Sequence, residues 1–379
     1  MSARIEANGL EDVVAATTRL SDVDGEQGRL VLAGYPVEEL AGRFSFEDAV
    51  FLLFRGALPT PAEQAAVREA LGEAREAAFE RLGELGDALA LPDGMDALRA
   101  SVAHLGARPG EEPLAEAFRI LGAIAVFAAA WSRGPSPVRP DPRLGHAADY
   151  LRMIGGIDAA PATPAAVAAL DAYLVTVIDH GMNASTFTAR VVASTASDTV
   201  SAVVAAIGAL KGKLHGGAPG PVLDMLDAID GGDGDGDPER ARVWVRTALA
   251  RGERIMGMGH RVYRVRDPRA FVLERAIADL EAAASGSSPI GRRLRLARAV
   301  EKEAETQLAA RHPDRPLKGN VEFYTAVLLE AVGLPRTLFT PTFAASRAAG
   351  WCAHVEEQRR HGRLIRPRSR YTDAAPAAG

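Results

Sequence analysis

The spacing of hydrophobic and polar positions predicts helices along nearly the whole chain. In the stretch 164–178 the apolar residues recur three or four positions apart, at Val167, Leu170, Leu174, Val177 and Ile178. This period puts them on one face of a helix that packs onto a core. Asp179 and His180 follow at its C-terminal end. The pattern therefore predicts a core helix that leads directly to a titratable histidine.

Capping residues predict where two earlier helices begin. Thr60 and Glu63 have the spacing of a capping box, with Pro61 at the first helical position. Ser45 with Asp48 opens another helix by the same kind of signal. We therefore expect helices to start directly after Ser45 and Thr60.

One short segment near the N-terminus predicts β structure. Asp24-Gly25 and Gly28 separate short runs that end in the apolar residues 30–32, as in a hairpin. Residues 133–145, rich in proline, and 231–238, with the sequence GGDGDGDP, have the composition of surface loops. The predicted fold class is all-α with a small N-terminal β hairpin.

Composition narrows the class of protein. The chain has 379 residues, enough for about two domains at roughly 100 to 200 residues each. Apolar residues make up 47% and charged residues 25%, the mixture of a folded globular protein. The 44 basic and 49 acidic residues leave a net charge of −5, which disfavours broad electrostatic binding to nucleic acid. We expect no nucleic-acid partner.

The cellular compartment is predicted from what the sequence lacks. Its N-terminus has no secretory signal or transit peptide, and no uncharged apolar run approaches the roughly 18 residues of a membrane span. The single cysteine, Cys352, cannot form an internal disulfide. We therefore expect a cytoplasmic protein without a membrane partner.

The sequence does not match the common calcium or zinc motifs in both residue type and spacing. Asp233, Asp235 and Asp237 are spaced as in a calcium loop. Pro238, however, stands where that loop needs glycine, and Trp244 where it needs a bidentate glutamate. No two histidines have the four-residue spacing of a helical zinc site. We expect no bound metal.

Three histidines stand beside glycine or at predicted helix ends. They are His180 in IDHGMN, His215 in LKGKLHGG and His260 in MGMGHRV. Glycine beside a polar ring lets a ligand approach the backbone closely. Taken singly, such a histidine is more often a structural residue than a catalytic one. Their positions alone leave both interpretations open.

An arginine follows the last of these histidines at a predicted helix start. Asp267-Pro268 has the pattern of an N-cap and a first helical residue. Arg269 should therefore lie in the first turn, nine residues beyond His260. From there its guanidinium can reach a carboxylate near the histidine.

An acid occupies a second helix start. Asn320 caps a predicted helix over residues 321–332, and Glu322 lies in its first turn. The cap and the helix dipole favour the ionised carboxylate. Acids are also common in first turns for stability alone, so the position by itself does not assign a role.

Five separated blocks, in this order, resemble the citrate synthase family: LHGG, MGMGH…DPRA, GNVEFYTAVLLEAVGLP, FAASRAAGW and LIRPRSRY. The resemblance runs from about Gly9 to Tyr371. It implies an acyltransferase that condenses acetyl-CoA with oxaloacetate, in the manner of the tricarboxylic acid cycle. It also implies a helical homodimer, each subunit with a large domain, 1–216 completed by 322–379, and a small domain, 217–321, that closes over the active site.

The resemblance implies a role for each candidate side chain. His215 would hydrogen-bond the thioester carbonyl of acetyl-CoA, while Glu322 removes a methyl proton. His260 would polarise the ketone of oxaloacetate and protonate the forming alkoxide. A neutral His215 suits this task, and we expect the N-terminus of a helix beginning near Pro219 to disfavour its cation.

Binding residues follow from the same resemblance. Substrate carboxylates would be held by His180, Arg269, Arg347 and Arg366, the last reaching across from the partner subunit. Coenzyme A would meet a loop of small or flexible residues, Met256, Gly257, Met258 and Gly259. Its phosphates would meet the basic residues Arg254, Arg264 and Lys318. No metal or permanently bound cofactor is implied, and acyl-CoA acts as a co-substrate.

One residue departs from the family pattern. The usual acid is an aspartate in an NVDFY-like block, and Glu322 stands in its place. The extra methylene moves the carboxylate by roughly an ångström, enough to cost about a hundredfold in rate unless the backbone compensates. Three functions remain open: citrate synthase, 2-methylcitrate synthase using propionyl-CoA, and a weakly active CoA-binding paralogue.

Overall fold

A computed structural model of the chain describes residues 9–10, 13–156, 160–216, 219–231, 237–260, 262–284, 289–313, 317–369 and 371. Within these ranges the fold is built from fifteen α-helices and one small sheet, which confirms the predicted all-α class. The calcium-spaced Asp233 and Asp235 lie outside the described residues, as does Gly217 at the predicted domain boundary.

The first half of the chain forms the N-terminal sheet and helices α1 to α9. They are β1 (Ser21–Asp24), β2 (Arg29–Leu32), β3 (Tyr35–Pro36), α1 (Val37–Leu40), α2 (Phe46–Arg55), α3 (Pro61–Glu80), α4 (Gly94–Ala103), α5 (Pro113–Arg133), α6 (His146–Gly155), α7 (Pro164–Val177), α8 (Ala184–Ala193) and α9 (Thr199–Leu210).

The second half supplies the longest helices. They are α10 (Pro219–Asp230), α11 (Pro238–Ala250), α12 (Pro268–Ala283), α13 (Pro289–Arg311), α14 (Val321–Ala331) and α15 (Phe339–His361). Short 3₁₀ turns at Leu82–Glu84, Ala88–Ala90 and Arg336–Leu338 complete the described elements.

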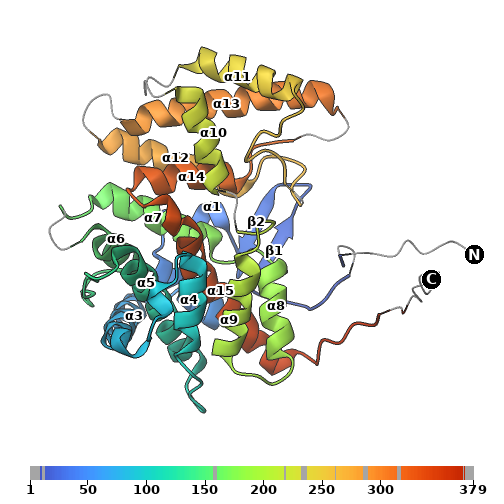
Figure 1. The fold of residues 1–379 in the computed structure, drawn as a ribbon. Coiled ribbons are helices and arrows are strands. Elements are labelled where there is room, and N and C mark those ends of the chain that lie inside the picture. Colours follow the sequence, from blue (N-terminus) through green and yellow to red (C-terminus); the bar gives the residue numbers. More distant parts are fainter. Residues whose placement is uncertain are drawn as a thin grey trace, which may run out of the picture.

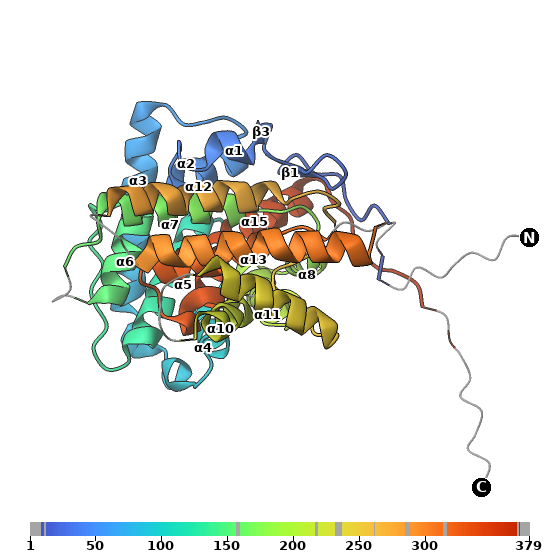
Figure 2. The ribbon, with the colours of Figure 1, turned by 90° about the horizontal axis from the view of Figure 1, so that it is seen from above.

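The helices form two layers that meet at α7. Helices α10 to α14 gather at the top of Figure 1, and α3 to α6 with α8, α9 and α15 form the body below. Helix α12 packs against α7 and α14, so it joins the two layers. Seen from above, α12 and α13 run alongside each other over this body (Figure 2).

The core of the lower layer is built on α5 and α15, which pack against each other. Trp351 of α15 is completely buried, and nearly every residue from Leu114 to Ala130 of α5 is buried too. Helix α5 has the length and apolar composition of a membrane span, with 83% of its most apolar 18-residue window inside the fold. That burial is the property of a central core helix.

Local capping chemistry explains where the helices begin. Thr60 and Glu63 form the predicted capping box of α3. The Ser45 hydroxyl accepts from the Asp48 N–H in the same way at α2. Asp267 caps α12, with proline at its first turn, as predicted. These starts are confirmed because each depends only on residues within four positions of one another.

The predicted hairpin is confirmed and extended by a third strand. β1 and β2 pair antiparallel in the register Ser21 with Leu32 and Asp24 with Arg29, and the short β3 joins the other edge of β2. Leu30 and Leu32 are buried and anchor the sheet to the core. The exposed turn between β1 and β2 is thereby held in a fixed direction.

Candidate active site

Five segments bring the candidate side chains together. His180 follows the end of α7, His215 follows α9, and His260 lies in the loop between α11 and α12. Glu322 is in the first turn of α14 and Arg347 in the middle of α15. The His215 ring lies 6.4 Å from the Phe343 ring, and the Arg347 guanidinium lies over that same ring at 4.7 Å. The charge of Arg347 also acts on the pKa values of His180 and Glu322.

Two histidines and a tyrosine form the middle of this centre. His180 Nε2 lies 3.0 Å from the Tyr263 hydroxyl. The His180 and His260 rings meet edge to face at 5.8 Å between centroids, and the His260 and Tyr263 rings lie 4.8 Å apart. Burial, followed by the positive charges of Arg269 and Arg347, holds the pKa of His180 well below its usual range. The cluster is therefore uncharged at neutral pH.

The loop itself fixes the protonation of His260. Its Nδ1 accepts hydrogen bonds from the Val262 N–H at 3.0 Å and the Tyr263 N–H at 3.1 Å. The remaining ring proton is therefore on Nε2, which lies 3.4 Å from Arg269 Nη2. Burial and then Arg269 lower the pKa of His260 to about 4. The ring presents a neutral N–H donor beside a guanidinium.

Asp267 holds Arg269 in this position. Its two carboxylate oxygens accept from Arg269 Nε at 3.0 Å and Nη2 at 2.8 Å, and both side chains are buried. The same Asp267 carboxylate accepts from the Val321 N–H at 3.3 Å, at the start of α14. One acid thus links the arginine of α12 to the helix that carries Glu322.

His215 packs against the N-terminus of α8. Its Nε2 lies 2.8 Å from the Ser185 hydroxyl and 3.4 Å from the Ser185 N–H, in the first turn of α8. The effect of the helix that begins at Pro219 stays a prediction, because Gly217, which leads into that helix, lies outside the described residues. Because a backbone N–H can only donate, we assign Nε2 as its acceptor and place the ring proton on Nδ1. Burial and then Arg347 lower the pKa of His215 to about 4.

Glu322 differs from the expectation for its ionisation. Asn320 caps α14 as predicted, with its Oδ1 accepting the Glu322 N–H at 3.0 Å. Burial works against the cap and the dipole and raises the pKa of this carboxyl group to about 7. Arg269 opposes this rise, and the acid of Asp267 adds to it. Desolvation of the charge outweighs the favourable helix end.

Arg347 is a buried arginine of α15 within this centre. Its Nε donates to the Val177 carbonyl at 2.6 Å, and its guanidinium lies over the Phe343 ring at 4.7 Å. Burial, together with the charge of Arg269, lowers its pKa to about 10 against the pull of Asp179. The side chain stays protonated at neutral pH and provides a buried positive charge.

The MGMG loop is joined to the segment before α14. The Gly259 N–H donates to the Lys318 carbonyl at 2.7 Å, and the Asn320 N–H donates to the Gly257 carbonyl at 2.9 Å. Gly257 has a φ of 74°, and an added Cβ would lie 2.8 Å from the Phe323 ring. Glycine is therefore required there by both backbone conformation and space. Met256 and Met258 are half-buried within the same loop.

The three basic residues proposed for coenzyme A have different surroundings. Arg254 is exposed at the start of this loop. Arg264 is half exposed, with Nε 3.9 Å from Glu26, and Lys318 donates to Glu305 at 2.8 Å. Lys318 is thus already paired.

Arg366 is the predicted site residue that the chain does not bring to the centre. It is exposed in an extended segment, 362–369, that leaves the end of α15. Figure 1 shows this segment running away from the body, on the same side as the N-terminus.

Several residues of the centre were assigned no role from the sequence. Tyr263 and Asp267 lie inside the MGMGH…DPRA block, so their position in that motif was the available signal. Ser185 contacts His215 and also accepts from Trp351 Nε1 at 3.1 Å. Nothing in the local pattern around Ser185 indicates this contact, because its partners lie 30 and 166 residues away.

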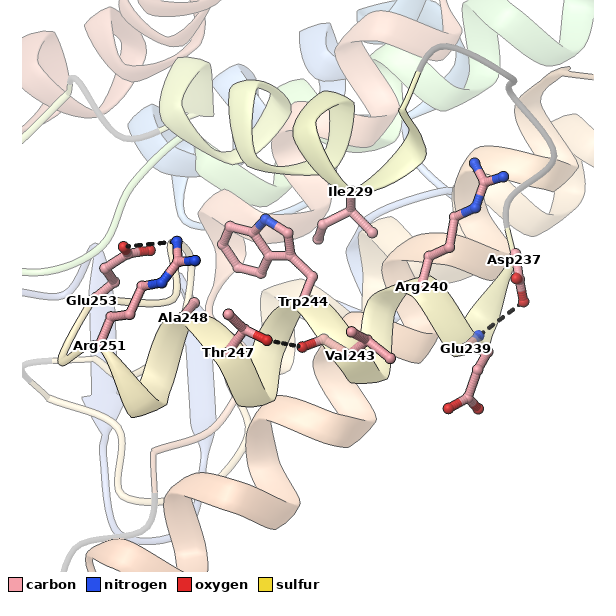
Figure 3. Close-up of a pocket in the computed structure, with 10 residues that line it drawn as sticks. All are labelled: Ile229, Asp237, Glu239, Arg240, Val243, Trp244, Thr247, Ala248, Arg251 and Glu253. Atoms are coloured by element: carbon pink, nitrogen blue, oxygen red, sulfur yellow. Dashed lines mark hydrogen bonds and ion pairs between the residues drawn. The ribbon is translucent and has the colours of Figure 1, made fainter.

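A surface pocket of about 460 Å³ lies elsewhere, along α11 and the end of α10. Figure 3 shows Trp244 and Ile229 facing each other across it, with charged residues at both ends. None of the candidate site residues lines this pocket. We assign it no part in the reaction.

The site combines neutral histidines, buried arginines and a carboxyl group whose pKa is about 7. With the helical fold, these groups define an enzyme that works by acid–base chemistry. The sequence model described as "Citrate synthase, C-terminal domain" matches residues 9–368. The chain belongs to the citrate synthase family and is an acyltransferase of that type.

Relatives at similar distance carry two different names. The chain is 40% identical to citrate synthase from Haloferax volcanii, covering 96% of this chain and 95% of the relative. It is also 40% identical to 2-methylcitrate synthase from Mycobacterium tuberculosis, covering 96% and 89%. A solved citrate synthase from Thermoplasma acidophilum, in ternary complex with carboxymethyl coenzyme A and oxaloacetate, superposes with a TM-score of 0.83 at 28% identity, covering 98% of this chain and 97% of that one.

Proposed function

We propose that the protein is a citrate synthase that condenses acetyl-CoA with oxaloacetate and hydrolyses the citryl-CoA intermediate to citrate and CoA. The Thermoplasma acidophilum relative was solved with carboxymethyl coenzyme A and oxaloacetate, which supports this pair of ligand classes. The reaction needs no resident cofactor, because each proton passes between a side chain and a substrate or water.

The observation that carries the proposal is the state of Glu322. Its pKa is raised to about 7 by burial, so the carboxylate is a stronger base than an exposed glutamate while still ionised in a large fraction at neutral pH. General-base catalysis is most efficient when the pKa of the base lies near the working pH. Glu322 is therefore suited to remove a methyl proton from the thioester.

His215 meets the charge that this proton transfer creates. With its ring neutral and Nε2 turned to the first turn of α8, the Nδ1–H donates to the thioester oxygen as it becomes an enolate. A neutral imidazole with a low pKa donates this bond without giving up its proton completely. The pair Glu322 and His215 thus acts on opposite ends of the same thioester unit.

The second substrate binds on the side of His260. Its Nε2–H donates to the ketone oxygen of oxaloacetate and protonates the alkoxide formed by carbon–carbon bond formation. Arg269, Arg347 and His180 surround this position and hold the substrate carboxylates, for which planar guanidinium groups are well shaped. Water then hydrolyses the citryl thioester.

Coenzyme A is assigned to the MGMG loop. The Gly257 carbonyl and the Gly259 N–H bind the segment before α14, so the loop is held in place to receive the adenine moiety. Arg254 and Arg264 are the nearby exposed cations for phosphate groups, whereas Lys318 must first leave Glu305. Replacing each of the three by alanine, and measuring KM for acyl-CoA, separates their contributions.

We further propose a homodimer in which Arg366 completes the neighbouring site. Within its own chain Arg366 is exposed, so its side chain is available to a second subunit. Light scattering should give twice the 39.9 kDa mass of the chain. A stable monomer with full activity contradicts this part of the proposal.

A second candidate is 2-methylcitrate synthase, favoured by the 40% identity to the enzyme of that name. The two acyl groups differ by one methyl group, which a pocket discriminates by only about 1 to 3 kcal/mol. Thiol release should therefore be measured with oxaloacetate and, separately, with acetyl-CoA and propionyl-CoA. A higher kcat/KM with acetyl-CoA supports citrate synthase, and a higher value with propionyl-CoA supports the second candidate. Release with neither identifies the weakly active CoA-binding paralogue.

A further inference from the structure

The β1–β2 hairpin contacts both histidine-bearing loops of the centre. In Figure 1 it stands at the side of the molecule, between the upper layer and α8. Its first strand lies against the segment that follows α7 and carries His180. Its turn lies against the loop between α11 and α12, which carries His260.

The contact at the base is made by Ser21, the first residue of β1. Its hydroxyl accepts from the Gly181 N–H at 2.8 Å and donates to Asp179, whose carboxylate is buried. Both partners flank His180 directly in the sequence. Val23, on the same strand, lies 3.3 Å from the position of a Cβ at Gly181. Ser21 therefore fixes the backbone on either side of His180.

Asp179 connects this contact to the core. His354 Nε2 lies 3.2 Å from the Asp179 carboxylate, and Arg190 Nε donates to His354 Nδ1 at 2.9 Å. All three side chains are buried, in α15, α8 and the segment after α7. The base of the hairpin is consequently held by a continuous hydrogen-bond chain that reaches two core helices.

The contact at the tip is made by the backbone of Gly25. Its carbonyl accepts from the Arg264 N–H at 2.8 Å. A Cβ added to Gly25 would lie 2.2 Å from the Val262 carbonyl oxygen, so no other residue fits without moving that loop. The N–H groups of Val262 and Tyr263 are the two donors that fix His260 Nδ1. The hairpin turn therefore packs against the residues whose N–H groups fix the tautomer of His260.

The two loops also meet each other. The Tyr263 hydroxyl lies 3.0 Å from His180 Nε2, which closes a triangle of hairpin, His180 segment and His260 loop. Within this triangle, a shift of the hairpin at either end changes the distance between the two histidines.

We propose that the β1–β2 hairpin is a positioning element for the condensation, with Ser21 and Gly25 holding the two histidine loops at the separation that oxaloacetate requires. This inference rests on the proposed function, since it concerns the same substrate. Ser21 and Gly25 act through His180 and His260 and are positioning residues. A displacement of about 1 Å in such a site costs about a hundredfold in rate.

Two single variants and their combination test the proposal. Ser21→Ala removes the base contact without adding atoms, and Gly25→Ala forces the tip away from Val262. Each should lower kcat/KM for oxaloacetate by about 10- to 100-fold. KM for acyl-CoA should change much less in Ser21→Ala, whereas Gly25→Ala also displaces Arg264 and should raise it. Because both act through one rigid element, the double variant should lose little more than the worse single variant. Fully multiplicative losses contradict a single positioning element.

Matched controls separate positioning from a general loss of structure. Gly83→Ala introduces the same methyl where nothing lies within 4 Å, and it should leave kcat and KM unchanged. Ser21→Thr keeps the hydroxyl and should restore most of the activity lost in Ser21→Ala. Unchanged kinetics in both Ser21→Ala and Gly25→Ala, or an equal loss in Gly83→Ala, overturns the proposal.

Amide hydrogen exchange supplies a readout that does not depend on turnover. The Gly181 N–H donates to Ser21, and the Arg264 N–H donates to Gly25. In Ser21→Ala, exchange should accelerate at Gly181 and also at Arg264, at the far end of the hairpin. Acceleration at Gly181 alone contradicts the proposal, even if Gly25→Ala does not fold. If the parent releases thiol with neither acyl-CoA, the proposed function fails, while this exchange experiment still decides the role of the hairpin.

Discussion

Asp267 and Arg269 form a buried ion pair in which both carboxylate oxygens accept from the guanidinium, at 3.0 and 2.8 Å. The pair lies between His260 and the start of α14. Its carboxylate therefore serves three purposes: it caps α12, orients Arg269 toward the histidine and binds the Val321 N–H.

Removing the charge from Asp267 should destabilise the fold. Asp267→Asn keeps the size of the side chain and leaves the Arg269 guanidinium buried without its counter-charge. Breaking a buried ion pair in this way costs about 3 to 5 kcal/mol. The free energy of unfolding, measured by urea denaturation, should fall by about that amount. An exposed pair, such as Arg29 with Asp22, is the control, and Asp22→Asn should change stability by less than about 1 kcal/mol.

Removing either central histidine should reduce turnover without unfolding the protein. His215→Ala removes the enolate donor, and His260→Ala removes the donor to the ketone. Each loss should lower kcat by about 10² to 10⁴, the range for a general acid or an oxyanion donor. The measurement is thiol release by variants whose circular dichroism matches the parent. Near-normal kcat in both correctly folded variants would falsify the assigned mechanism.

Glu322→Gln should abolish the proton-transfer step while substrate binding persists. Glutamine has nearly the same size and keeps hydrogen-bonding capacity, but it is not a base. Exchange of the acetyl-CoA methyl protons into deuterated water should therefore collapse. Oxaloacetate binding, followed by calorimetry, is the control and should remain. An unchanged exchange rate removes Glu322 from the mechanism.

Glu322→Asp tests whether the backbone has adjusted to the longer side chain. If the site is built for glutamate, the shorter aspartate carboxylate stops roughly an ångström away from the methyl group. Turnover should then fall by about one to two orders of magnitude, as measured by steady-state thiol release. A rate well above the parent has the opposite meaning, that the natural glutamate is a handicap, and it favours the weakly active paralogue.

The pH dependence of kcat/KM should report Glu322. Burial raises the pKa of this carboxyl group to about 7, so the active carboxylate form is lost as the pH falls below that value. The pKa values of His215 and His260 are lowered to about 4, so both rings stay neutral throughout this range. The profile should fall tenfold per pH unit below about 7 and level off above it. A midpoint near 4.5, as for an exposed glutamate, contradicts the buried environment of Glu322.

Local features of the fold were predictable from the sequence. The starts of α3, α12 and α14 follow from Thr60, Asp267 and Asn320, because an N-cap and its N–H partners lie within a few residues of each other. The β1–β2 hairpin follows from its glycines in the same way. The family, too, was predictable, since its motifs are continuous blocks of the chain.

The electrostatic state of the centre was decided by the tertiary structure. From its helix position alone, Glu322 should be ionised, yet burial raises its pKa to about 7. His215 is held by Ser185 of α8, which lies 30 residues away in the chain. Desolvation and partner choice depend on which distant segments pack together, and a local pattern contains neither.

By itself, then, the sequence determined the helices, their caps and the motif residues, because these depend on neighbours along the chain. Only the tertiary structure brought Tyr263 to His180 across 83 residues and placed Gly25 against the loop of His260. Such contacts arise when the buried faces of separate elements pack together. Their distances and pKa values are properties of that packing, and they are what turn three separate histidines into one centre.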